Sequence, residues 1–501
     1  MKKFVIVGSG SAGLIAAGMI KKYWKDGVDI TVIHDKSQGS IAVGESTTPY
    51  IHAFLTFCGI SEKDLIRDLD VTIKLGINFK NWIPDTEYFH GFGQITGQNG
   101  WNKLRSSDPS ATYSILNDVY SGGSLYNEPM TKVPTTIFDN FSHALHIDTR
   151  QFTDYLYEKL NGDIKFVDDI VTRVRVNTEC TKIESVECKY NGIFDADYFI
   201  DASGFNTILF KHLNPKWNDM SKYLPIDRAI PQQIPYDFKD ELPSYTLAEA
   251  TDNGWIWRIP IGDRYGTGYL YSSKFTSDEE AREKYNDWLV ENFDTELTSD
   301  RIIKYRPGYY EEYWMGNCLA VGLSSGFVEP LESTGIHIII KQIQEFINYN
   351  SNLKNLEFNR KSANLINKNI YVDVVNFVAL HYNTDRTDSE FWKHVKDNKP
   401  DWVKDIDEKI REGSVDASIY RNNPLSSLWT LDSYVQVTNG LKMISKESIQ
   451  NHLNSKPEGN GVFASGEQIL EVCKNMHDCE VSEKNNQIFV SHKGIIDSIH
   501  K

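Results

Sequence analysis

The segment FVEPLESTGI, residues 327–336, brings together the side chains of this chain that are best suited to chemistry. Glu332, Ser333 and Thr334 place a carboxylate and two hydroxyls directly before Gly335, where the apolar run IHIII predicts that a helix begins. The first N–H groups of a helix have no partner within it and carry a partial positive charge. The segment is therefore suited to hold an anion or the polar edge of a cofactor.

A second motif, GSGSAG, lies between the apolar run KFVIV and a helical pattern that begins near Leu14. Its glycines have the G-x-G-x-x-G spacing: Gly8, Gly10 and Gly13. The first permits a tight turn, the second lets the backbone approach a pyrophosphate, and the third lets the helix close on the strand. Because a second strand is predicted at 30–33, a dinucleotide site is favoured over a chance glycine turn. The acidic ribose ligand is left open, since His34 ends that strand and Asp35 follows.

Two later segments favour FAD over NAD. The run DYFIDASGF, residues 197–205, resembles the late strand-plus-glycine motif of flavoproteins. The run NCLAVGLSSGFVEPLESTGI, residues 317–336, resembles their second FAD motif, in which a helix N-terminus lies against the flavin. The dipole of that helix stabilises negative charge on the reduced ring.

Five segments in order carry a resemblance that covers Met1 to about Leu441. They are GSGSAG, VGESTTP (43–49), TIKLGINFKNW (72–82), GWIWRIP (254–260) and FVEPLESTGI. Together they resemble the flavin-dependent tryptophan/indole halogenases. GWIWRIP matches the W-x-W-x-I-P element of that family, which flavin hydroxylases of the same fold lack.

The resemblance implies two catalytic residues. Lys74 matches the lysine that holds hypohalous acid, as a hydrogen-bonded acid or a haloamine, and aims it at one carbon of an aromatic ring. Glu332 matches the glutamate that polarises the halogen species or takes the ring proton. The alternatives are an ordinary solvated lysine, although Lys74 is the only charge in VTIKLGINF, and a helix N-terminal carboxylate.

Halide and cofactor contacts follow from the same resemblance. Thr334 and Gly335 would bind halide through backbone N–H groups, and Ser333 would bridge the flavin side and the lysine side. The implied FAD contacts are Gly8, Gly10, Ser11, Ala12, Gly13, Gly44, Glu45, Ser46, Leu323, Ser333, Gly335 and Ile336. Residues 44–46 match the strap of the family that touches the flavin, although Gly-Glu-Ser is also an ordinary turn. His146 and Asp148 match an H-x-D position, where a structural histidine is the better interpretation.

The substrate site is predicted from aromatic residues that match the family and from one departure from the family's pattern. His90, Phe92 and Trp429 match residues that sandwich an indole in the family, the alternative being ordinary core aromatics. Counting back from Trp429 puts Ala417 and Ser418 where tryptophan halogenases have a Tyr-Tyr pair. It puts Pro424 where they have an acid that helps hold the free amino acid. Because an unpaired zwitterion is costly to bury, we expect free tryptophan to be a poor substrate.

Composition excludes several classes of function. The net charge is −16, from 53 basic and 69 acidic residues, with no block of Lys or Arg. This argues against nucleic acid and against an anionic membrane surface. No apolar run approaches the length of a membrane span, so a cytoplasmic protein is expected. The six cysteines form no CxxC, which favours reduced thiols over disulfides or a metal site.

The expected fold class is α/β, with a Rossmann-type, flavin monooxygenase-like FAD-binding module over residues 1–345. A loop-rich substrate-side insertion is expected at about 83–141. Residues 346–501 are expected to form a mostly helical subdomain that completes the substrate chamber. The length of the chain suffices for one large module and a smaller one.

The sequence thus predicts an FADH2- and O2-dependent halogenase of an indole-type substrate other than free tryptophan. No NAD(P)H site is evident, so a separate flavin reductase is the expected partner. A homodimer is the assembly suggested by the family. The alternatives are a tryptophan halogenase, a flavin-dependent aromatic hydroxylase of the same fold, and an FAD-binding protein without turnover.

Overall fold

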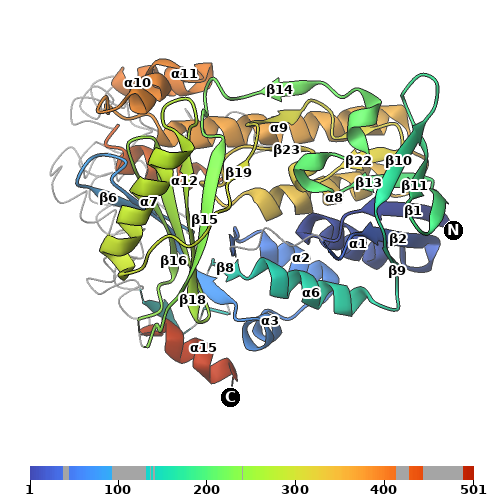
Figure 1. Cartoon of the computed structure of the whole chain (residues 1–501), viewed down its shortest axis with the longest axis horizontal. Helices are drawn as coiled ribbons and strands as arrows, with labels where there is room; N and C mark the ends of the chain where they lie inside the picture. The colour runs from blue at the N-terminus through green and yellow to red at the C-terminus, as the bar shows by residue number, and fades with distance from the viewer. Residues whose placement is uncertain are drawn as a thin grey trace, which may run out of the picture. The chain divides into compact units, whose positions relative to one another are not determined.

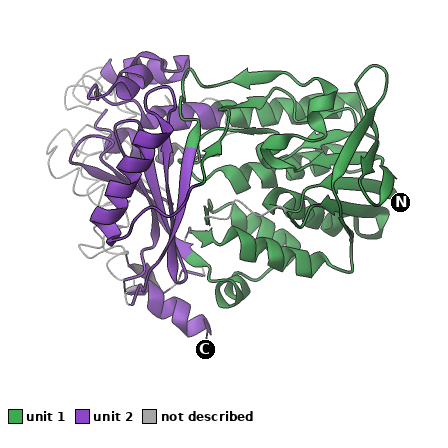
Figure 2. Ribbon diagram, in the orientation of Figure 1, with its two compact units in different colours: residues 1–72, 144–228, 301–372 green, residues 73–143, 229–300, 373–501 purple. Residues whose placement is uncertain are grey.

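The computed structural model describes residues 1–37, 44–92, 131–135, 137–138, 142–239, 241–412, 428–443 and 489–500. The chain forms two compact units, each assembled from three stretches of sequence (Figure 2). Unit 1 consists of residues 1–72, 144–228 and 301–372. Unit 2 consists of residues 73–143, 229–300 and 373–501. These interleaved units do not coincide with the expected division at residue 345, and that functional division stays a prediction.

The core of unit 1 is a six-stranded sheet with the strand order β21-β22-β13-β1-β2-β9 (Figure 1). Its strands are β1 (Lys2–Val7), β2 (Val28–His34), β9 (Lys165–Asp168), β13 (Tyr198–Asp201), β21 (Trp314–Met315) and β22 (Cys318–Ala320). Every pairing is parallel except that of β21 with β22. The predicted α/β fold is confirmed, because apolar runs such as FVIV are buried in a parallel sheet.

Unit 1 also contains helices. They are α1 (Ser11–Trp24), α2 (Ile51–Cys58), α3 (Glu62–Asp68), α6 (Thr149–Leu160) and α8 (Gly335–Asn350). α1 packs against α2, α6 and α8. The start of α8 at Gly335 is where the sequence predicts it. α9 (Glu357–His381) begins in unit 1 and ends in unit 2.

Smaller sheets complete unit 1. They are formed by β3 (Glu45–Ser46) with β8 (Ala144–Ile147), by β10 (Val171–Val176), β11 (Ile183–Cys188) and β12 (Gly192–Asp195), and by β14 (Trp217–Asp219), β20 (Gly308–Tyr310) and β23 (Gly326–Phe327). Short 3-10 turns are η1 (Lys25–Gly27), η2 (Gly204–Asn206), η3 (Phe210–Leu213) and η4 (Gly322–Ser324). The chain passes into unit 2 within β4 (Thr72–Lys74).

Unit 2 contains a mostly antiparallel sheet. In order, the strands of this sheet that belong to unit 2 are β15 (Arg228–Pro235), β18 (Arg264–Tyr271), β17 (Gly254–Ile261), β16 (Tyr245–Ala250), β5 (Gly76–Lys80) and β6 (Glu87–Gly91). β17 and β18 form an antiparallel hairpin, which the alternating pattern of WIWRIPIGDRYGTGYLY, residues 255–271, predicts. Trp257 fills the space over Gly268, where a Cβ would lie 2.1 Å from the indole. The residue opposite this tryptophan must therefore be glycine.

Helices and one short strand pair make up the rest of unit 2. The helices are α7 (Asp278–Phe293), α10 (Glu390–Asp397), α11 (Asp401–Arg411), α12 (Leu431–Gly440) and α15 (His492–His500). β7 (Lys132–Pro134) pairs with β24 (Phe489–Ser491), while β19 (Ile303–Lys304) is the remaining strand of unit 1. Helices account for most of the residues between 346 and 412. None of the described helices is long and apolar enough to cross a membrane.

Candidate active site

The glycine turn after β1 is built as its spacing predicts. Gly8 has a φ of +110°, and its N–H donates to Ile33 O at 2.9 Å. A Cβ at this position would lie 2.3 Å from the carbonyl oxygen of Ala202. A Cβ at Gly13 would lie 2.0 Å from Gly8 O. Both positions therefore exclude any side chain, because backbone atoms cannot move aside.

The start of α1 is open and suited to an anion. Among the described residues, no atom beyond its own chain neighbours and helix backbone lies within 4 Å of where a Cβ of Gly10 would stand, and no side chain caps the helix. The first turn has no acidic residue. The Ser11 hydroxyl is buried without a hydrogen-bond partner in the described chain. An unpaired buried hydroxyl and uncapped N–H groups fit the pyrophosphate of a dinucleotide.

The other cofactor motifs end at the same edge of the sheet, because β13 lies parallel and next to β1, and β22 lies parallel and next to β13. Asp201, fully buried at the end of β13, accepts N–H bonds from Leu209 at 2.7 Å and Phe210 at 2.8 Å. A Cβ at Gly322 would lie 3.0 Å from the Cβ of Ala12. The turn η4, which carries the half-buried Leu323, thus packs on α1 beside the glycine turn.

The segment before α8 buries its polar side chains. Glu332, Ser333 and Thr334 are each less than a tenth exposed, as is Ile336 in the first turn. Ser333 has a φ of +59°, a left-handed conformation that costs a non-glycine residue free energy and is found mostly at functional sites. In the part of the chain that the structure describes, no side chain caps α8 and the space beside Gly335 is open. Its first N–H groups are therefore available to an anion.

The strap is joined to this segment by a hydrogen bond. Ser333 Oγ donates to Ser46 Oγ at 3.0 Å. Gly44, just before β3, is buried with a φ of +93°. One carboxylate oxygen of Glu45 is buried and has no hydrogen-bond partner among the described residues, although the residue as a whole is half-buried. Burial raises the pKa of Glu45 to about 7, because the charged form is poorly solvated there.

Contacts that the sequence did not predict hold the residues after the strap, Thr48 and Tyr50, on α8. The rings of Tyr50 and His337 stack with centroids 4.2 Å apart. Thr48 Oγ1 lies 3.0 Å from His337 Nδ1, and the Tyr50 hydroxyl donates to Gln344. Burial, with a smaller effect of Lys341, lowers the pKa of His337 to about 3. A neutral imidazole therefore binds the segment after the strap to α8.

Two positions that the sequence analysis left open have hydrogen bonds within the described chain. His34, at the end of β2, has its Nδ1 2.9 Å from Ser9 Oγ, while Asp35 accepts from Ser37 N at 2.9 Å. His146 is fully buried beside Thr72, with Nδ1 3.2 Å from Oγ1. The N-cap of α6 is formed by the carboxylate of Asp148. His146 and Asp148 thus have structural contacts.

In unit 2, Lys74 is fully buried, which excludes a solvated surface lysine. Its Nζ lies 5.1 Å from the centroid of the Phe92 ring, within range of a cation–π interaction. The antiparallel pairing of β5 with β6 brings the two together, since Phe92 N donates to Leu75 O at 3.0 Å. Lysine is rarely buried without a function or a partner.

An aromatic wall in unit 2 includes a residue that the sequence analysis missed. Phe377, on α9, stacks on Trp429 with centroids 4.1 Å apart, and it lies 5.7 Å from the His90 ring. His90 is buried, while Phe92 and Trp429 are half-buried. Asp373 holds the Trp429 segment by accepting the Leu428 N–H at 3.1 Å. Phe377 has no distinctive sequence signal, because buried aromatics are common in long helices.

The positions behind the substrate prediction, Ala417, Ser418 and Pro424, lie outside the described residues. So does most of the insertion expected at 83–141. The substrate preference inferred from those positions therefore stays a prediction.

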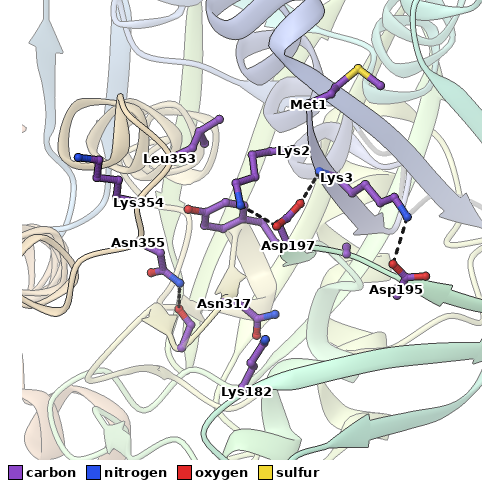
Figure 3. Close-up of a pocket in the computed structure, with 13 residues that line it drawn as sticks. Met1, Lys2, Lys3, Lys182, Asp195, Asp197, Asn317, Leu353, Lys354 and Asn355 are labelled. Atoms are coloured by element: carbon purple, nitrogen blue, oxygen red, sulfur yellow. Dashed lines mark hydrogen bonds and ion pairs between the residues drawn. The ribbon is translucent and has the colours of Figure 1, made fainter.

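A separate pocket of about 530 Å³ lies in unit 1 at the start of β1 (Figure 3). Lys2 pairs with Asp197 at 2.8 Å and Lys3 with Asp195 at 3.1 Å, so two of its cations are neutralised. Gly8 follows the other end of the same strand. Dinucleotides bind at the carboxyl ends of parallel strands, so this pocket is not the cofactor site.

A family model described as tryptophan halogenase matches residues 3–456. This chain belongs to the tryptophan halogenase family. The chain is 30% identical over 494 residues to the tryptophan 7-halogenase RebH of Lentzea aerocolonigenes, covering 88% of this chain and 90% of that protein. It is 31% identical over 426 residues to the tryptophan 6-halogenase SttH of Streptomyces toxytricini, covering 79% and 80%. The SttH crystal structure matches the whole of both chains with a TM-score of 0.83 at 26% identity. The protein is a flavin-dependent halogenase, as its motifs predict.

Proposed function

We propose that this halogenase uses FAD, delivered as FADH2 by a separate flavin reductase, to halogenate an indole-type substrate other than free tryptophan. When bound, reduced FAD would supply two of the four electrons that O2 accepts, and the halide would supply the other two, so that FAD, hypohalous acid and water result. The observation that carries the proposal is the fully buried Lys74 beside Phe92, in the unit that also holds the aromatic wall of Phe377 and Trp429.

The residues of unit 1 fit the cofactor and the halide. The uncapped start of α1 and the Ser11 hydroxyl, which has no hydrogen-bond partner among the described residues, suit the pyrophosphate. The FAD contacts implied by the resemblance include residues 44–46, Ser333, Gly335 and Ile336. The N–H groups at Thr334 and Gly335 would bind the halide, since no side chain of the described chain caps them. Glu332 would accept the proton that the aromatic ring loses.

Lys74 would hold hypohalous acid by hydrogen bonds from its ammonium group. A buried, strand-borne cation has few rotamers, so the electrophile is presented to one ring carbon of the substrate. Flat walls such as Phe377 and Trp429 suit an electron-rich aromatic ring. A homodimer remains the predicted assembly.

A Lys74→Ala variant tests the halogenase site. Enzyme, FAD, a flavin reductase, NADH, air and bromide are combined, and brominated product is measured by mass spectrometry. Lys74→Ala should lower product formation by about 100-fold or more, with FAD affinity unchanged. Lys80→Ala, which removes a half-buried lysine from β5, is the matched control and should keep activity. Equal activity of Lys74→Ala and wild type would refute the role of Lys74.

Substrate choice is tested with indole and free tryptophan in separate reactions. We expect bromoindole, identified by its paired bromine isotopes, and little bromotryptophan. The second candidate substrate is tryptophan itself, which the names of the relatives favour. Bromotryptophan as the main product would keep the enzyme class and overturn our substrate proposal.

A further inference from the structure

The C-terminal segment contributes a buried histidine that contacts the strand of Lys74. His492, the first residue of α15 (red in Figure 1), is fully buried. Its Nε2 accepts the N–H of Ile73 at 3.0 Å. The other ring nitrogen must then carry the proton, and it donates to Leu242 O and Pro243 O, each at 3.2 Å.

These contacts secure the backbone on one side of Lys74. Ile73 is its immediate neighbour in β4, and on the other side Leu75 N donates to Ser244 O at 2.7 Å. Residues 242–244 therefore hold both flanks of Lys74, one through His492 and one directly. The histidine is itself anchored, because its backbone N–H donates to Thr131 O at 2.8 Å.

Only one form of the ring fits this arrangement. A protonated imidazole would direct a second N–H at the Ile73 N–H, and two donors cannot bond each other. Burial lowers the pKa of His492 to about 4, so the ring is neutral at neutral pH. An apolar residue of the same shape would fill the space but leave the Ile73 N–H buried and unpaired.

We propose that His492 is a positioning residue for Lys74, acting through the backbone of Ile73. This rests on the proposed function, in which Lys74 presents hypohalous acid to the substrate. A displaced ammonium would still sit in unit 2 but would aim the electrophile poorly. Halide oxidation depends on the residues of unit 1, so His492 should govern the use of hypohalous acid and not its formation.

The test compares His492→Phe with His492→Gln, with His500→Phe as the matched control on an exposed histidine of the same helix. Phenylalanine cannot bond the backbone, whereas glutamine has both an acceptor and a donor. We expect His492→Phe to lower kcat for bromination about tenfold with KM unchanged. The amount of free hypobromous acid that reacts with an added enol should rise in parallel. His492→Gln should recover part of the loss. Wild-type kcat and trapping in His492→Phe would overturn the proposal.

Amide hydrogen exchange tests the contact without turnover. In the full chain without FAD, the Ile73 N–H should exchange at least about tenfold faster in His492→Phe than in wild type or His500→Phe. Unchanged exchange would overturn the proposal. If the wild type halogenates nothing, the proposed function fails, and this exchange measurement still decides the contact.

Should His492→Phe not fold, His492→Ala with added imidazole replaces it. Added imidazole should then raise kcat and slow the exchange of the Ile73 N–H. If a folded His492→Ala variant has the wild-type kcat, and imidazole changes neither kcat nor the exchange of the Ile73 N–H, the proposal is overturned.

Discussion

Replacing Glu45 by glutamine should remove the free energy that ionising this carboxyl costs the folded protein as the pH rises above about 4.5. The carboxyl has a pKa of about 7 when folded, against an ordinary value of 4.5. Because the folded value is the higher, the folded state binds the proton more tightly. The stability linked to that proton is fully present below about pH 4.5 and is lost as the pH rises through 7.

The size of the effect follows from the two pKa values. Their difference corresponds to roughly 3 kcal/mol once the group is fully ionised in both states. At about pH 5 the cost is only about 1 kcal/mol, because the folded carboxyl is still protonated. Glutamine keeps the shape and cannot ionise. The stability of Glu45→Gln relative to wild type should therefore increase by about 2 kcal/mol between pH 5 and pH 8.

The assay is urea unfolding of wild type and Glu45→Gln at the two pH values, without FAD. Comparing the two proteins at each pH cancels the titration of all other groups. Glu184→Gln, which removes an exposed carboxylate from β11 of the same unit, should show no such change. If the stability difference between Glu45→Gln and wild type is the same at both pH values, burial does not raise the pKa of Glu45.

Two further predictions concern backbone conformation. Gly13→Ala should prevent FAD binding, measured by quenching of flavin fluorescence, because the new Cβ would lie 2.0 Å from Gly8 O; retained affinity would contradict the close turn. Ser333→Ala should destabilise the protein by about 1 kcal/mol more than Ser333→Gly, since both lose the bond to Ser46 but only alanine bears the left-handed φ of +59°. Thermal unfolding of the two variants checks this, and equal melting temperatures would count against strain at Ser333.

Local patterns predicted much of the fold. The run KFVIV with the glycines after it predicted a strand, a tight turn and a helix, and β1 and α1 follow that order. The hairpin of β17 and β18 and the start of α8 at Gly335 were predicted in the same way. Such features depend on side-chain period and on allowed φ values within a few residues, so neighbouring residues suffice to encode them.

Contacts between distant segments could not be predicted. Ile73 and His492 are 419 positions apart, and the C-terminal segment is polar and weakly patterned. Phe377 and the stacked pair of Tyr50 and His337 likewise come from elements whose mutual packing no motif specifies. A family resemblance identifies the residues that match a motif, but it does not identify the partners that hold them.

The sequence by itself determined which chemical groups this halogenase has and in which local elements they stand: a carboxylate and hydroxyls before α8, glycines after β1, a lone lysine in an apolar strand. Only the tertiary structure decided the state of those groups. It buried Lys74, left one oxygen of Glu45 without a hydrogen-bond partner among the described residues and made His492 a neutral hydrogen-bonding bridge. The physical reason is that solvation and hydrogen bonding set a group's charge and aim. Both depend on atoms that the chain brings together only when it folds.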